Sequence, residues 1–165
     1  KLIGETLGTF TLTVERLAGD TLIASTTFAD IPVTANSVAS TAVASAENIP
    51  LMLAVDVDGD GIIDANIAPG TGLSVEELLG LLRGFVKTLD LPTKKEAQLL
   101  KKINKFEKVI EREYKNERKK KQKTKQVFKD LLQVIKRLEK KELLTGEEAK
   151  ELMNIIERIR GGVVE

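Results

Sequence analysis

The sequence predicts an α+β chain, in which a small antiparallel β-sandwich is followed by a helical bundle of three to four helices. Residues 8–68 carry β signals, and within them residues 9–15 and, in part, 27–31 alternate apolar and polar side chains with a period of two, as strands with one solvent-facing side do. Residues 71–165 instead carry apolar side chains at helical spacing, with lysine and glutamate between them. Residues 69–72, Pro-Gly-Thr-Gly, interrupt both patterns. We therefore expect two domains, 1–70 and 71–165.

The β half contains few expected strands. Residues 9–15 alternate strictly, and Gly19-Asp20 has the chemistry of a hairpin turn. The strands are expected at residues 8–17, 21–31, 37–45, 51–57 and 62–68. So few strands leave sheet edges uncovered and a thin core. The sandwich is therefore small and open, or truncated, or completed by a strand from a neighbouring chain.

Capping boxes mark three helix starts in the second half, at Ser74–Glu77, Thr93–Glu96 and Thr145–Glu148. The helices are expected at residues 75–89, from Lys94 onward, around Phe128 to Leu138, and from about Gly146 to Gly161-Gly162.

The connection between the second and third helices has two interpretations. Neither glycine nor proline interrupts residues 115–126, so residues 94–141 form either a hairpin or one helix of ~70 Å. We favour the hairpin, because the ends of a single long helix would lack a partner in a monomer.

The net charge of +1 conceals two oppositely charged halves. Residues 1–70 contain two basic and nine acidic residues, for −7, and residues 71–165 contain 24 basic and 16 acidic residues, for +8. A partner is expected to recognise one half rather than the average. Abundant lysine and glutamate, with pairs such as Glu111 to Lys115 and Glu117 to Lys121, fit a thermophile.

Histidine and cysteine are both absent. Their absence excludes Ser-His-Asp and Cys-His nucleophile systems, histidine or thiolate metal ligands, and disulfides. With no other catalytic constellation present, we predict that the chain is not an enzyme. We expect no transmembrane segment, because no apolar run is long enough to span a bilayer, and no basic-then-apolar leader pattern is found. Because the sequence starts at Lys1 without methionine, we expect a processed product or a segment of a longer protein.

Residues 56–64 form the pattern D-x-D-x-D-G-x-x-D, which can direct several oxygen atoms at one hard cation. The expected ligands are the side chains of Asp56, Asp58, Asp60 and Asp64 and the carbonyl oxygen of Ile62. A polar hairpin turn between buried strands is the alternative. Turn chemistry explains the glycines but not the mutual repulsion of four carboxylates, so we predict a calcium site.

The aspartate pattern resembles the first nine positions of an EF-hand or dockerin loop and the aspartate repeats of thrombospondin type 3 modules. It departs from the EF-hand at the place of the bidentate glutamate, where Ile67 stands. The remaining ligand would be water or come from elsewhere in the protein.

A basic run between Tyr114 and Phe128 offers a second candidate site, for an anionic polymer such as wall polysaccharide, nucleic acid or a lipid surface. Its residues are Arg118, Lys119, Lys120, Lys121, Lys123 and Lys125. No aromatic side chain is interleaved with them, so nucleic acid is not expected. A solvated helix end is the competing interpretation.

Four helical segments carry a further pattern: residues 81–87 (LLRGFVK), 99–103 (LLKKI), 128–132 (FKDLL) and 143–149 (LLTGEEA). They resemble the FIMAH-type helical domain at the C-terminus of many large prokaryotic secreted and surface proteins. Residues 26–33 (TTFADIPV) and the aspartate loop are similar to the β segment that often precedes it.

The resemblance implies an extracellular or cell-surface, non-catalytic accessory domain whose partner is its parent polypeptide or a neighbouring surface protein. The alternative is a self-assembling surface-filament or surface-layer subunit, with calcium and strand addition at its joints.

Overall fold

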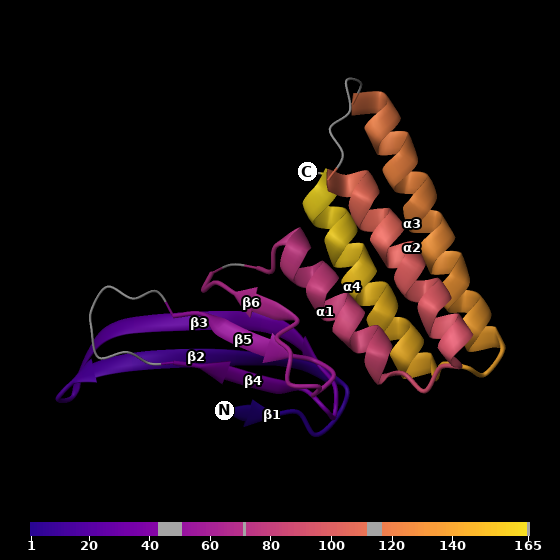
Figure 1. Cartoon of the computed structure of the whole chain (residues 1–165). Helices are drawn as coiled ribbons and strands as arrows, with labels where there is room; N and C mark the ends of the chain where they lie inside the picture. The colour runs from indigo at the N-terminus through magenta and orange to yellow at the C-terminus, as the bar shows by residue number, and fades with distance from the viewer. Residues whose placement is uncertain (43–50, 71, 112–116, 165) are drawn as a thin grey trace.

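The computed structural model describes residues 1–42, 51–70, 72–111 and 117–164, with side chains described for 121–163 in the last range. Within these residues the chain has two antiparallel sheets followed by four helices (Figure 1). The α+β prediction is confirmed.

The larger sheet has the strand order β1-β4-β5-β6. Its strands are β1 (Leu2–Ile3), β4 (Val38–Thr41), β5 (Leu53–Asp56) and β6 (Ala65–Ile67). All neighbouring strands are antiparallel, and β5 lies between β4 and β6 with Leu53 and Val55 fully buried. The short edge strand β1 was not expected from the sequence.

The smaller sheet is a long hairpin of β2 (Gly8–Ala18) and β3 (Thr21–Val33). The hairpin turn predicted at Gly19-Asp20 is confirmed, because Ala18 pairs with Thr21 and Gly19 has a φ of 60°. A glycine suits this position because a positive φ costs it no steric penalty.

Three expected strands are shorter than their sequence patterns, and one of them, expected at residues 51–57, is β5, which covers only Leu53–Asp56. The strand expected at residues 37–45 is β4, which ends at Thr41, and residues 43–45 lie outside the described ones. The strand expected at 62–68 starts only at Ala65. Its first residues belong to the aspartate loop, where a carboxylate of Asp60, rather than a neighbouring strand, accepts the N–H of Ile62.

The four helices are α1 (Val75–Thr88), α2 (Thr93–Glu111), α3 (Glu117–Lys140) and α4 (Gly146–Val164). Helices α2 and α3 are separate and lie side by side in Figure 1, which confirms the hairpin interpretation. Within the described residues, no helix is both long and apolar enough to serve as a membrane span.

Two of the three predicted capping boxes are confirmed. The N–H of Glu77 donates to Ser74 Oγ at 3.2 Å, and Glu77 Oε2 accepts from the N–H of Ser74 at 2.6 Å. Thr145 and Glu148 make the equivalent pair of bonds at the start of α4.

The capping box predicted at Thr93 is wrong. The N–H of Glu96 donates to the carbonyl oxygen of Pro92 at 3.1 Å, because Thr93 is already the first helical residue. The end predicted for α4 at Gly161-Gly162 is also wrong. The helix continues to Val164, and Val163 packs against the core.

Buried side chains of the sheets and the helices form one continuous hydrophobic cluster. Helix α1 is central to it, because it contacts β6, α2 and α4. A hydrogen bond also connects the helices to the sheets: Arg158 Nη1 of α4 donates to the carbonyl oxygen of Asp30 in β3 at 2.9 Å. The core thus crosses the expected boundary near residue 71 without interruption.

Candidate metal centre and basic surface

The aspartate loop, residues 57–64, connects β5 to β6 beside helix α1. Gly59 and Gly61 both have positive φ, 75° and 88°, a conformation that other residues adopt at a cost. Gly59 also lies against the chain preceding β4, because a Cβ there would stand 2.7 Å from the carbonyl oxygen of Asn36. The two glycines therefore let the loop turn sharply and lie close to a neighbouring segment.

Three aspartates of the loop region meet at one point. Ligand oxygens of Asp56, Asp58 and Asp64 all lie within 4.8 Å of one another, so these residues could hold a metal ion. Asp56 is 5% exposed, and the other two are half-buried. Oxygen donors alone, with no nitrogen or sulfur ligand, suit a hard cation.

The same carboxylates also fix the loop by accepting backbone hydrogen bonds. Asp56 Oδ1 accepts from the N–H of Gly59 at 2.7 Å, and its Oδ2 accepts from the N–H of Gly61 at 2.9 Å. Asp64 Oδ2 accepts from the N–H of Val57 at 2.8 Å. These bonds are compatible with a cation loop and with the polar-turn alternative, because each carboxylate oxygen can accept more than one partner.

Of the other two expected ligands, the side chain of Asp60 lies outside the three-aspartate group and is 39% exposed. Ile62 is 67% exposed, and the role of its carbonyl oxygen as a ligand stays a prediction. Ile67 is buried in β6 with 2% exposed and offers no side-chain oxygen at the place of the EF-hand glutamate.

A residue that the sequence did not reveal, Lys87 of α1, faces the aspartate loop. Its Nζ lies 2.9 Å from Asp58 Oδ2 and 3.2 Å from Asp60 Oδ2. The bond to Asp58, helped by the one to Asp60, raises the pKa of Lys87. An ammonium group thus already neutralises part of the charge that a metal ion would neutralise.

Two glycines of α1 were also overlooked. A Cβ on Gly84 would overlap the carboxylate of Asp64 and stand 2.8 Å from Val57 Cβ. A Cβ on Gly80 would overlap the carbonyl oxygen of Asp64. The spacing Gly80-x-x-x-Gly84, with Lys87 three residues further on, was the available signal, because these positions share one helix face.

Contact with α1 changes the acidity of the loop. Burial is the main cause that raises the pKa of Asp64, and the neighbouring Asp58 and Asp56 raise it further, against the N–H of Val57. The pKa of Asp60 is lowered, first by the N–H of Ile62 and then by Lys87. Burial thus disfavours the charged form of Asp64, the aspartate whose carboxylate lies against Gly84 of α1.

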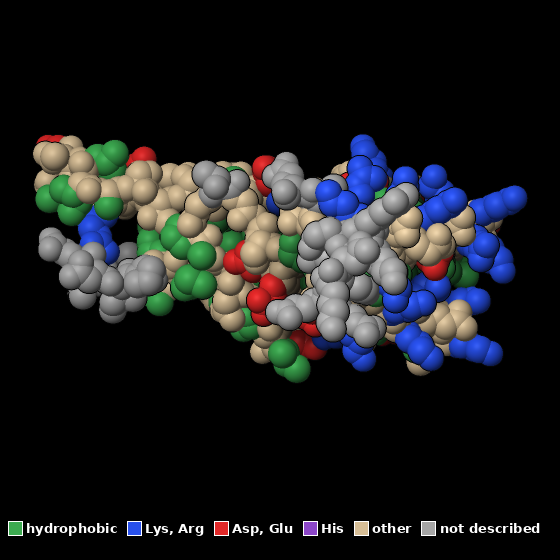
Figure 2. Space-filling view, turned by 90° about the horizontal axis from the view of Figure 1, so that it is seen from above, with side chains coloured by type: hydrophobic (Ala, Val, Ile, Leu, Met, Phe, Trp, Pro, Cys, Tyr) green, Lys and Arg blue, Asp and Glu red, His purple; other side chains and the backbone are tan. Residues whose placement is uncertain are grey.

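The basic run lies on the first half of α3. Lys121, Lys123 and Lys125 are exposed there, whereas the side chains of Arg118, Lys119 and Lys120 lie outside the described ones. In Figure 2, Lys and Arg side chains gather over the helices. The excess of basic residues in the second half of the sequence thus lies on the surface of the helices.

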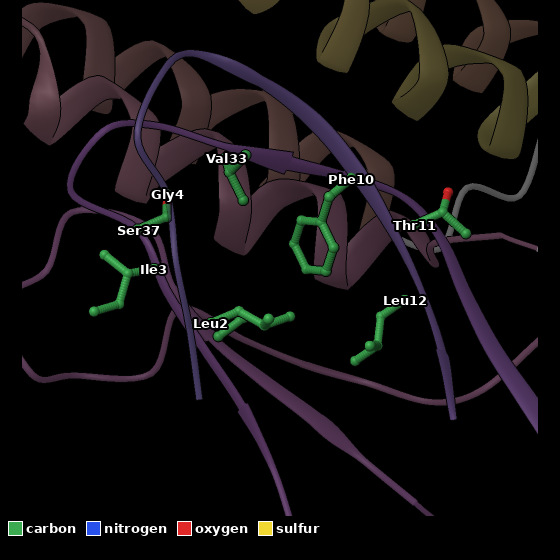
Figure 3. Close-up of a pocket in the computed structure, with 9 residues that line it drawn as sticks. Leu2, Ile3, Gly4, Phe10, Thr11, Leu12, Val33 and Ser37 are labelled. Atoms are coloured by element: carbon green, nitrogen blue, oxygen red, sulfur yellow. The ribbon is translucent and has the colours of Figure 1, made fainter. Parts of the chain in front are cut away.

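An apolar pocket of about 310 Å³ opens at the edge of the two sheets, where β1 lies beside β2. Leu2, Phe10, Leu12 and Val33 surround it in Figure 3. Among the described residues, β2 pairs with no strand but β3. This edge of the β half is therefore open.

Comparison of the chain with protein-family models, with curated proteins and with solved structures finds no match. Functional assignment therefore depends on the residues and their geometry.

Proposed function

We propose that the chain is a non-catalytic, calcium-stabilised accessory module of an extracellular or cell-surface prokaryotic protein. The observation that supports this most directly is the position of the three-aspartate group, which lies where the sheets meet helix α1. A cation there would stabilise the contact between the β half of the chain and helix α1.

Calcium would act through charge and shape together. It would neutralise the clustered carboxylates of Asp56, Asp58 and Asp64, and it would favour the charged form of Asp64, whose pKa is raised by burial and by its two neighbours. It would also compete with the Lys87 ammonium for Asp58. Sites in extracellular modules bind calcium at roughly 0.1–1 mM, which an incomplete set of protein ligands with added water can reach.

We also propose that the two sheets form a small β-sandwich and that the four helices form a helical bundle. Phe28 and Ile31 of the hairpin are buried in one cluster with Leu53 and Val55 of the other sheet, as in a small sandwich. Helices α1 and α2, α2 and α3, α3 and α4, and α1 and α4 are in contact, as in a four-helix bundle. A non-catalytic role fits a chain without histidine or cysteine.

A double substitution, Asp58→Ala with Asp60→Ala, tests the calcium proposal by thermal unfolding. We expect a lower melting temperature than wild type in calcium and almost no difference in chelator, because relief of the repulsion among the clustered carboxylates offsets the loss of the ion pairs with Lys87. Asp90→Ala, which removes an exposed carboxylate outside the loop, is the matched control. Equal losses in both conditions would contradict the proposal.

A self-assembling surface subunit is the second candidate, and the open pocket between β1 and β2 favours it. At its far end the hairpin exposes three apolar side chains, Leu17, Leu22 and Ile23, which are 59%, 52% and 52% exposed. A chain with an apolar projection and an apolar recess at different places can associate head to tail. Sedimentation that depends on protein concentration would favour this candidate, since an accessory module stays monomeric.

A further inference from the structure

A groove runs along α3 beside the last turns of α4, away from the aspartate loop. We call it the α3–α4 groove, and its volume is about 530 Å³. It is lined by Lys121, Thr124, Lys125, Phe128, Lys129, Leu132 and Arg160. The volume falls in the usual range for small-molecule sites.

The lining residues of α3 form two parallel rows. Thr124, Phe128 and Leu132 follow one another at intervals of four residues, and so do Lys121, Lys125 and Lys129. Residues four apart lie on the same face of a helix, so a floor made of Phe128 (5% exposed) and the half-buried Leu132, with Thr124 at one end, runs beside a line of ammonium groups. The floor extends over about two turns, or roughly 12 Å, which suits an elongated ligand better than a small ion.

Arg160 closes the other side of the floor. Its guanidinium carbon lies 4.9 Å from the centre of the Phe128 ring, and the Phe106 ring contacts Phe128 at a centroid distance of 6.4 Å. Arg160 also pairs with Glu157 at 2.9 Å, but both side chains are about half exposed. Such a pair is weak enough for another anion to replace Glu157.

The polar groups of the α3–α4 groove have few partners. Lys121, Lys125 and Lys129 form no ion pair with any residue whose side chain is described. Thr124 is 4% exposed, and its Oγ1 has no hydrogen-bond partner within the described part of the chain. A buried hydroxyl without a partner is uncommon and calls for an explanation.

We propose that the α3–α4 groove binds a single-chain amphiphile with an anionic head. The head would pair with Lys125 and Arg160, and the alkyl chain would lie on Phe128 and Leu132. Charge complementarity supports this choice: a polyanion would leave the apolar floor unused, and a neutral apolar ligand would desolvate the ammonium groups without compensation. The proposal does not depend on the calcium site.

Calorimetric titration of the full chain with dodecanoate below its micelle concentration tests the proposal. We expect saturable binding at about one molecule per chain, with no saturation by acetate or by dodecyltrimethylammonium. Acetate lacks the alkyl chain of dodecanoate, and dodecyltrimethylammonium carries a positive head group in place of the negative one. Binding of either probe as tight as that of dodecanoate would overturn the proposal.

Substitutions then locate the site. Lys125→Gln with Arg160→Gln should weaken dodecanoate binding by about tenfold or more, because charge-assisted contacts are lost. Lys136→Gln, at an exposed position of α3 outside the groove, should change it by less than about twofold. All three are surface positions, and unchanged melting temperatures would establish that the variants fold. Equal effects of the two variants, or polyphosphate that binds and displaces dodecanoate from wild type, would overturn the assignment in favour of a general polyanion surface.

Discussion

The Nζ atom of Lys87 lies 2.9 Å from Oδ2 of Asp58, across the boundary between helix α1 and the aspartate loop. Helix α1 thereby supplies a positive charge to a loop that has none of its own. The side chain of Asp58 is 7% exposed, and Lys87 neutralises part of its charge. We expect a calcium ion bound at the three aspartates to compete with Lys87 for this carboxylate.

Replacing Lys87 by glutamine tests this competition. In chelator, Lys87→Gln should lower the melting temperature, because three clustered carboxylates lose their nearest cation. Calcium should then raise the melting temperature of the variant more than that of wild type, and calcium affinity should increase. Lys150→Gln, at an exposed position of α4, is the control. If calcium stabilised Lys87→Gln less than wild type, the competition between lysine and metal would be refuted.

Alkaline pH gives an independent test of the Lys87 contact in chelator. The bond to Asp58 raises the folded-state pKa of Lys87 above its ordinary value of 10.5. The stability that Lys87 contributes is therefore fully present below about pH 10.5 and is lost as the pH rises through the folded-state pKa. The free energy of unfolding of wild type minus that of Lys87→Gln, measured with urea, should be constant below this pH and shrink above it. A difference that does not vary with pH would mean that the ion pair contributes nothing.

A methyl group on Gly84 should disturb the joint between α1 and the loop. Gly84→Ala places a Cβ against the carboxylate of Asp64 and against Val57, so we expect a loss of about 1–3 kcal/mol in unfolding free energy. Gly161→Ala is the matched control, because nothing lies within 4 Å of a Cβ there. In a helix this control should be neutral or stabilising by up to about 1 kcal/mol. Chemical denaturation measures both, and equal effects would show that α1 does not pack closely on the loop.

Local chemistry was readable from the sequence where it is set by near neighbours. The Gly19-Asp20 turn and the capping boxes at Ser74 and Thr145 involve residues within a few positions of one another. The α+β class was equally accessible, because the apolar period changes from two to helical at the boundary.

Contacts between distant segments were not readable in this way. Lys87 is 29 positions from Asp58, and only the packing of α1 on the loop brings them together. The strand expected at 62–68 starts only at Ala65 for a different, local reason, because the N–H of Ile62 donates to the carboxylate of Asp60 instead of a strand. Alternation of side chains does not reveal which acceptor a backbone N–H will find.

Calorimetric titration of calcium into chelator-treated protein tests the central proposal most directly, with magnesium as the control ion. We predict saturable binding near one ion per chain, selective over magnesium because calcium accepts an irregular set of oxygen ligands, whereas magnesium demands near-ideal octahedral geometry. Absence of saturable calcium binding would contradict it. The aspartate loop would then be a polar turn that Lys87 neutralises, and the α3–α4 groove would be the surface to pursue.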